Sequence, residues 1–229
     1  FSTHTSKGLS FDLYHDGFKD SVWLTCLDTL LDFEGYVLKN GEYYTSVLDL
    51  NAVGLDLIDP LDTGQVISGS FAADFESSST GKIEVNKLLL QRPNDSVFLD
   101  SLVAEHSLKE SVRTLVIQSE VANGELVGDW DFKALPNIME VMISSSYDDG
   151  TVKSWPKAEL EGYLRVGEVN WLANLFHLPL AVESGSTLKW DYNGFGKNWS
   201  FESAIRSGAY GSYAFTGIDL TIQHQGIYF

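Results

Sequence analysis

The chain has 229 residues, of which 44% are hydrophobic and 21% are charged, and its formal net charge at pH 7 is −17. This composition is typical of a globular protein and excludes a disordered or collagen-like chain. An acidic surface repels phosphate backbones and anionic headgroups, so we expect no nucleic-acid partner and no direct membrane insertion. The longest apolar runs are also shorter than the roughly 20 residues of a membrane-spanning helix.

Strands dominate the first half of the chain. Asn40-Gly41, between two β-rich runs, is the signal for a hairpin turn of type I′. The amphipathic run Ser21–Phe33 instead predicts a helix that ends before Gly35. Alternation and β-branched residues predict further strands at Leu9–Tyr14, Tyr36–Leu38, Tyr43–Leu48, Gln65–Phe75, Lys82–Leu90 and Ser96–Val103.

The second half shows the same signals. Asn123-Gly124 and Asp149-Gly150 predict two more hairpin turns. A capping box at Ser107–Glu110 predicts a short helix, and Phe201–Arg206 predicts another. Strands are predicted at Thr114–Val121, Glu125–Phe132, Ile138–Ser145, Thr151–Trp155, Glu159–Val166, Leu178–Val182, Thr187–Tyr192 and Ile218–Ile222.

About a dozen short strands with turn signals between them are typical of antiparallel β-sandwiches and jelly rolls. We therefore predict a mainly β fold, an antiparallel β-sandwich or jelly roll with two or three short helices. No Pro/Gly/Ser-rich linker divides the chain, which favours a single β-rich unit over residues 1–229. The alternative division is two compact jelly rolls, 1–113 and 114–229.

Motifs for cofactors and catalysis are missing from the sequence. It has no dinucleotide fingerprint, phosphate-binding loop, His-Glu-x-x-His helix or nucleophile elbow. Cys26 is the only cysteine, and its apolar neighbours predict a buried residue. Asp56, Asp59 and Asp62 lie around Pro60, where an acidic turn is favoured over a calcium site. We expect no cofactor, no metal ion and no catalytic residue.

Paired carboxylates are the one candidate for catalysis in the sequence, because glycosidases use two carboxylates. Glu159 and Glu161 lie two residues apart, so on a strand both point to one face, near Trp155 and Tyr163. The polar outer face of a half-buried strand produces the same pattern without chemistry. Similar pairs occur at Asp129 and Asp131 and at Asp74 and Glu76.

Aromatic residues, 13% of the chain, gather toward the C-terminus. Exposed aromatic rings can stack on sugars, and Trp190, Tyr192 and Trp199 are the candidates for such carbohydrate binding. The competing interpretation places these rings in the core or at a subunit interface.

Two C-terminal segments carry a resemblance. Leu178–Asp191 has the pattern of a strand, a tight Ser-Gly turn and a second strand, and Ala214–Phe229 has that of a long final strand. This pairing resembles the C-terminal half of the upright jelly-roll major capsid proteins of icosahedral, membrane-containing bacterial and archaeal viruses. The resemblance implies a non-enzymatic shell subunit that forms oligomers and does not touch the genome.

The sequence leads to three functional hypotheses. The first is a self-assembling capsid subunit in the virion, whose partners are further copies of itself, as a trimer or larger homo-oligomer, and other shell proteins. The second is a secreted or surface carbohydrate-binding β-sandwich, which is extracellular. The third is a sandwich glycosidase or lyase that uses Glu159 and Glu161.

Overall fold

The computed structural model describes residues 9–15, 19–27, 31–54, 64–76, 79–92, 95–145, 154–167 and 180–225. The chain divides into two compact units, Phe1–His106 (unit 1) and Ser107–Phe229 (unit 2). The alternative division expected from the sequence lies a few residues further along, after residue 113. Asp56, Asp59 and Asp62 are outside the described residues.

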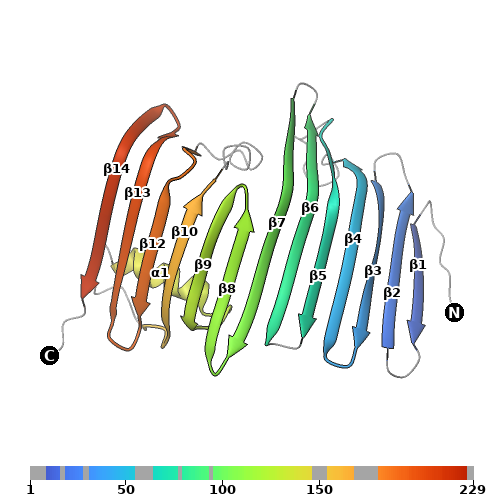
Figure 1. Ribbon diagram of the computed structural model, residues 1–229, viewed down its shortest axis with the longest axis horizontal. Helices are drawn as coiled ribbons and strands as arrows, with labels where there is room; N and C mark the ends of the chain where they lie inside the picture. Colours follow the sequence, from blue (N-terminus) through green and yellow to red (C-terminus); the bar gives the residue numbers. More distant parts are fainter. Residues whose placement is uncertain are drawn as a thin grey trace. The chain divides into compact units, whose positions relative to one another are not determined.

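Unit 1 is an antiparallel meander in which each strand lies beside the next one in the chain (Figure 1). Antiparallel pairing explains this order, because each connection returns the chain alongside the strand it has just left. The strands are β1 Leu9–His15, β2 Lys19–Leu27, β3 Leu31–Asn40, β4 Tyr43–Gly54, β5 Val66–Glu76, β6 Thr80–Arg92 and β7 Asp95–Lys109, the last of which continues past His106.

The helix predicted at Ser21–Phe33 is wrong, because its described residues belong to β2 and β3. An apolar run of this length fits a helix or a strand, and pairing with neighbouring strands decides between them. Trp23 lies opposite Tyr36 in the register, with ring centroids 4.7 Å apart. Such cross-strand aromatic pairs stabilise a sheet.

The hairpin predicted between Tyr36–Leu38 and Tyr43–Leu48 is confirmed, but the type I′ turn predicted at Asn40-Gly41 is wrong, because the loop lies one residue later and neither Asn40 nor Glu42 has a positive φ. β3 ends at Asn40, which pairs with Tyr43 at the start of β4, so the loop is Gly41-Glu42. Gly41 has a φ of +62°, in the left-handed region that glycine enters without strain.

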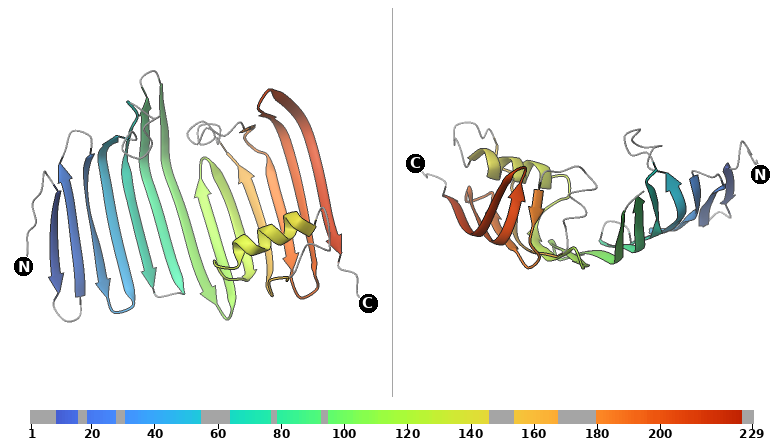
Figure 2. Two further views of the ribbon diagram at one scale, coloured as in Figure 1. Left: turned by 180° about the vertical axis from the view of Figure 1, so that it is seen from behind. Right: turned by 90° about the horizontal axis from the view of Figure 1, so that it is seen from above.

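Unit 2 combines antiparallel strands with one helix, α1 (Leu135–Ser145). The strand order is β8-β9-β10-β12-β13, with β14 on the free edge of β13. α1 lies across one face of this sheet (Figure 2). The strands are β8 Val112–Ser119, β9 Ala122–Asp129, β10 Glu159–Val166, β11 Leu180–Val182, β12 Thr187–Asn193, β13 Asn198–Tyr210 and β14 Tyr213–Gln225.

The expected tight turn between β11 and β12 is not a chain reversal. Both strands pair antiparallel with β13, so they run in the same direction as one interrupted strand. Ser186 holds the interruption: its Oγ donates to the Glu183 carbonyl at 2.8 Å and accepts from the Arg206 N–H at 3.2 Å. Gly185, with a φ of +87°, donates to the Val166 carbonyl at 2.7 Å.

The strand predicted at Ile138–Ser145 is wrong, because these residues lie in α1. Apolar residues at Leu135, Ile138, Val141 and Met142 follow helical spacing, so one side of the helix faces the sheet. The helices predicted at Ser107–Glu110 and Phe201–Arg206 are also wrong. Strand β7 and the turn after it occupy the first segment, and β13 occupies the second.

The turn predicted at Asn123-Gly124 is wrong, although the hairpin itself forms. The reversal comes earlier, where Ser119 Oγ accepts from the N–H groups of Val121 and Ala122 at 3.1 and 3.0 Å. Gly124 lies within β9, where a Cβ would approach the Tyr163 carbonyl oxygen to 2.4 Å. This glycine therefore permits close backbone packing. The turn predicted at Asp149-Gly150 lies outside the described residues.

The coarse fold prediction, a mainly β antiparallel chain with few helices, is confirmed. The finer prediction of a β-sandwich or jelly roll is not confirmed. In unit 2, the described element that covers the apolar side of the sheet is a helix rather than a second sheet.

Candidate functional site

Unit 1 carries an apolar sheet face. Successive residues of a strand point to opposite faces, so the registers of β1–β6 show which side chains share a face. One face, which we call the apolar face, consists of Leu13, Val22, Leu24, Cys26, Phe33, Val37, Leu48, Leu50, Phe71, Ala73, Phe75, Ile83 and Val85.

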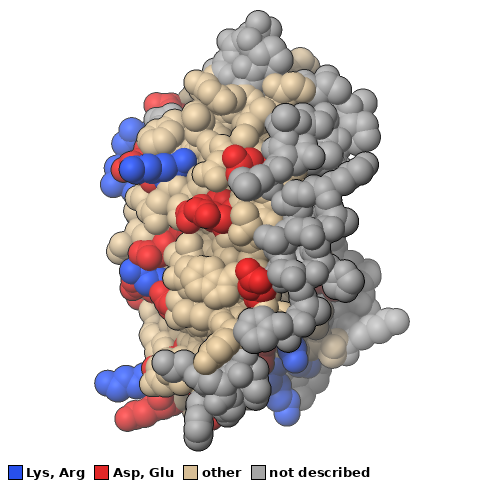
Figure 3. Space-filling model, turned by 90° about the vertical axis from the view of Figure 1, so that its right-hand side faces the viewer, with Lys and Arg blue, Asp and Glu red and all other residues tan. Residues whose placement is uncertain are grey.

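Charge separates the two faces of this sheet. On the apolar face, the charged residues with described side chains are Asp20 and Lys39, which are register partners at one end. In Figure 3, many charged side chains lie along the left border of the molecule, further acidic side chains lie near its middle, and tan surface separates the two groups. The opposite face, which we call the polar face, carries Asp12, Glu34, Asp49, Asp74, Glu76, Lys82 and Glu84.

Side chains on the polar face form hydrogen bonds and ion pairs with one another. Tyr43 donates its hydroxyl to Glu76 at 2.7 Å, and this contact raises the pKa of Tyr43. Lys82 lies 2.7 Å from Glu84, and this carboxylate raises the pKa of Lys82. Asp74 and Glu76, which form one of the predicted carboxylate pairs, therefore share a face that is occupied by structural contacts.

Several side chains on the apolar face are exposed, and no described element of unit 1 packs on that face. Leu13 is 66% exposed, and Val37 and Ile83 are each 42% exposed. No helix is described in unit 1, and its buried apolar residues in the described part are Cys26, Val53, Leu90 and Leu99. The expected burial of Cys26 is confirmed. A face with this composition needs a cover, because exposed apolar patches of this kind mark interaction sites.

In unit 2, helix α1 packs on the apolar side of the sheet. Ile138 and Val141 of α1 pack against a cluster that includes Leu160, Tyr192 and Trp199. Ser145 links the helix to the sheet by accepting the Trp199 indole N–H at 2.8 Å.

Two of the three predicted carbohydrate-binding residues lie in this core. Tyr192 is 1% exposed and donates its hydroxyl to the Pro156 carbonyl at 2.9 Å, and burial raises its pKa to about 12. Trp199 is 4% exposed. Neither ring presents an open face for a sugar, so the structure brings these residues together as packing partners.

Trp190 has a different position. It pairs with Gly162, and a Cβ at Gly162 would come within 2.1 Å of the indole ring. The indole therefore occupies the space that a side chain at Gly162 would fill. Trp190 shares a face of the sheet with Leu160 and Tyr192, so its ring lines the apolar cavity beneath α1, and the residue also borders a cleft on the other face of the sheet.

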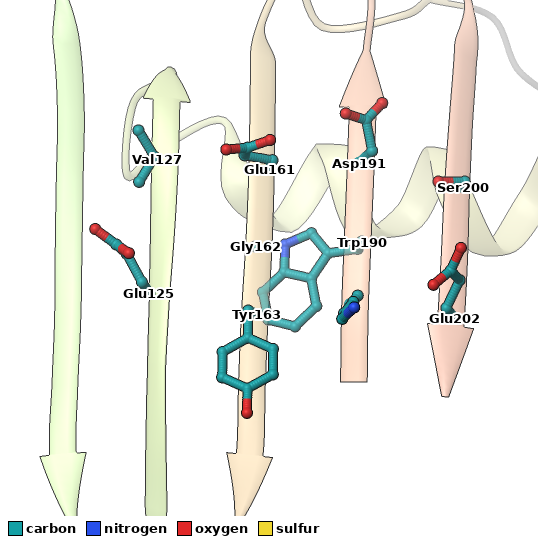
Figure 4. A pocket seen from close by; sticks show the side chains of 10 residues that line it. Glu125, Val127, Glu161, Gly162, Tyr163, Trp190, Asp191, Ser200 and Glu202 are labelled. Carbon is teal, nitrogen blue, oxygen red and sulfur yellow. The ribbon is translucent and has the colours of Figure 1, made fainter. Parts of the chain in front are cut away.

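The second candidate site, which we call the acidic cleft, lies on the face away from α1 and has a volume of about 330 Å³. Glu161 lies directly opposite Asp191 in the register, and Tyr163 lies opposite Glu125. Figure 4 shows the carboxylates of Glu161 and Asp191 on adjacent strands, with Glu202 one strand further along. The cleft is lined by Glu125, Val127, Glu161, Gly162, Tyr163, Lys189, Trp190, Asp191, Ser200 and Glu202.

The predicted pair Glu159 and Glu161 does share a face of β10. Glu159, however, accepts a hydrogen bond from the Asn193 amide at 2.9 Å and does not line the cleft. The neighbour of Glu161 in the cleft is Asp191, which sequence reasoning missed because it comes from another strand. In the remaining predicted pair, Asp131 accepts the Lys133 N–H at 2.8 Å just before α1, so it shapes the start of the helix.

A larger apolar cavity of about 530 Å³ lies between α1 and the sheet. Its walls include Leu135, Ile138 and Met142 of α1 and Leu160 and Phe201 of the sheet. Met139 and Ile143, at its rim, are 63% and 60% exposed.

Among the residues that the structure describes, no group of three or more His, Cys, Asp or Glu side chains is arranged to hold a metal ion. Within the same part of the chain, no helix has the length and hydropathy needed to cross a membrane. Comparisons with protein-family models, curated proteins and solved structures return no match for this chain.

Proposed function

We propose that this protein is a structural subunit without catalytic activity that assembles with further copies of itself. The observation that carries the proposal is the apolar face of unit 1, whose described charges cancel in a chain of net charge −17 and on which no described element of the unit packs. Exposed apolar faces of this kind mark interaction sites, and self-assembly would cover this one.

The virion shell is the particular assembly that we propose, and the virion is the proposed location, with other shell proteins as further partners. The resemblance of residues 214–229 to the long final strand of jelly-roll capsid proteins supports this choice, since β14 is a long strand. The acidic composition is compatible with it, because a shell over an internal membrane does not have to contact nucleic acid.

The two-layered sandwich belongs to this proposal as well. A single sheet with one apolar face becomes a sandwich when a second sheet packs on it at about 10 Å. We propose that assembly supplies the second layer for unit 1.

Light scattering after size-exclusion chromatography tests self-assembly, at several protein concentrations and at low and high salt. We expect an oligomer whose fraction rises with concentration and with salt, because salt screens repulsion between acidic subunits. Ordered arrays in electron micrographs would support the shell. A monomer at every concentration and salt would refute the proposal.

A second candidate function is carbohydrate binding, for which the acidic cleft is the supporting observation. Tyr163 provides a ring surface, and Glu161, Asp191 and Ser200 provide hydrogen-bonding groups around about 330 Å³. Sugar sites combine these features, since ring faces contact C–H groups and polar side chains fix the hydroxyls.

A glycan-array screen followed by calorimetry tests this candidate. Asp191→Asn and Glu161→Gln keep the size of each side chain and should weaken glycan binding at least tenfold. Glu159→Gln on the same strand is the matched control, because Glu159 does not line the cleft. Equal affinity in all three variants would exclude the cleft as a sugar site, and unchanged turnover in Glu161→Gln would exclude a glycosidase that uses Glu161.

A further inference from the structure

We infer that the apolar face of unit 1 is covered by the apolar face of a second copy, so that two unit 1 sheets form an intermolecular β-sandwich. This inference rests on the proposed self-assembly and names the partner and the surface that meets it. A two-fold axis relates the two copies, which makes the contact isologous, the commonest arrangement in soluble dimers.

The size of the face meets the requirement of a stable dimer. Six strands about 4.8 Å apart, each contributing about seven residues at about 3.3 Å, give a face of roughly 650 Å². Two such faces bury roughly 1,300 Å² in total, within the range of about 1,200–2,000 Å² for specific interfaces.

The distribution of charge favours contact between two copies through their apolar faces. Elsewhere the subunits repel one another, since each carries a net charge of −17. The apolar face holds Lys39 and Asp20 as neighbours at one end, so its described charges cancel. The Lys39 ammonium also lies 5.5 Å from the Tyr44 ring centroid, which keeps it at the border of the face. Two such faces can therefore meet without burying like charges against each other.

The sizes of the side chains on the apolar face also suit packing against a second sheet. Large side chains at Phe33 and Phe71 alternate with small ones at Gly35 and Ala73 on the same face. Inner faces of sandwiches interdigitate in this way, with large side chains entering the gaps left by small ones.

Neighbouring residues of β3 provide a matched test. Val37 points to the apolar face and is 42% exposed, while Leu38 points to the polar face and is 37% exposed. Because Cys26 is the only cysteine, Cys26→Ala gives a thiol-free background. Val37→Cys and Leu38→Cys are then compared by their rate of reaction with a thiol reagent. We expect the thiol at position 37 to react at least tenfold more slowly at high concentration, and the two rates to converge on dilution.

Val37→Glu and Leu38→Glu extend the test to assembly, with circular dichroism to check folding. Val37→Glu should abolish the oligomer measured by light scattering, and Leu38→Glu should leave it intact. An oligomer in which both thiols react equally would overturn the inference and leave self-assembly standing. A monomer would overturn both proposals, and slow reaction at position 37 in that monomer would show that the chain covers its own apolar face.

Discussion

The two units differ in how the apolar side of their strands is buried. Each unit has antiparallel strands with one apolar side, yet only unit 2 contains a described element that packs on that side. In unit 2, α1 packs on the apolar side of the sheet through Ile138 and Val141. The Trp199 indole N–H also donates a hydrogen bond to Ser145 of the helix. In unit 1 large side chains such as Leu13 and Ile83 remain exposed on the corresponding side.

The difference shows that alternation along strands determines which side of a sheet must be buried, but not what buries it. A single sheet has one apolar side to cover, and a helix, another sheet or another molecule can do so. Unit 2 should therefore be stable by itself, whereas the stability of unit 1 should depend on its neighbours.

The largest expected effect separates the two units. Trp199→Ala removes a buried ring from unit 2 and should lower the free energy of unfolding by about 3–5 kcal/mol at any protein concentration. Phe71→Ala in unit 1 should cost about 1 kcal/mol in dilute solution, because the ring is only partly buried in the single chain.

Hydrogen exchange resolved by mass spectrometry measures both effects, because it reports on each unit separately. If a second copy covers the apolar face, the effect of Phe71→Ala grows with protein concentration, since association stabilises the folded state by mass action. Equal and concentration-independent losses for the two variants would remove the distinction between the units.

The next effect depends on pH and is confined to unit 2. Burial raises the pKa of Tyr192 to about 12, above its value of about 10 in the unfolded chain. The folded state therefore holds this proton more tightly, and its stabilising effect is complete below pH 10 and is lost as the pH rises toward 12. The loss should amount to roughly 2 kcal/mol.

Denaturant titrations between pH 9 and pH 12 measure this dependence. Tyr192→Phe should remove it, at the cost of about 1 kcal/mol for the hydrogen bond to the Pro156 carbonyl. Identical pH profiles for the variant and the parent chain would show that another group carries the dependence.

Local patterns predicted much of the sheet but not its helix. The strand Glu159–Val166 was predicted with the bounds that the structure shows, because alternating polar and apolar residues leave no competing interpretation. Ser21–Phe33 was predicted as a helix, but its described residues form strands, whereas Ile138–Ser145 was predicted as a strand and forms a helix. Both are short apolar runs, whose state is decided by the strands or sheet that they contact.

The candidate sites needed information that one sequence does not hold. Glu161 and Asp191 come together through the register of β10 and β12, and no local spacing connects them. Tyr192 and Trp199 were interpreted as possible sugar contacts because aromatic residues have the same local pattern in a core and on a binding surface. The position of α1 over the sheet decides between these interpretations.

The smallest effect tests how α1 is held in place. Ser145→Ala removes the acceptor of the Trp199 indole N–H and leaves that donor buried without its partner, which should cost about 1–2 kcal/mol. Ser79→Ala in unit 1 is a matched control, because its exposed hydroxyl bonds only to the nearby Glu76 carbonyl and water can replace that contact. Thermal unfolding followed by tryptophan fluorescence should show a lower midpoint for the first variant alone. Since the hydrogen bond joins the cover of unit 2 to its sheet, an unchanged midpoint would mean that apolar packing by Ile138 and Val141 holds the helix without it.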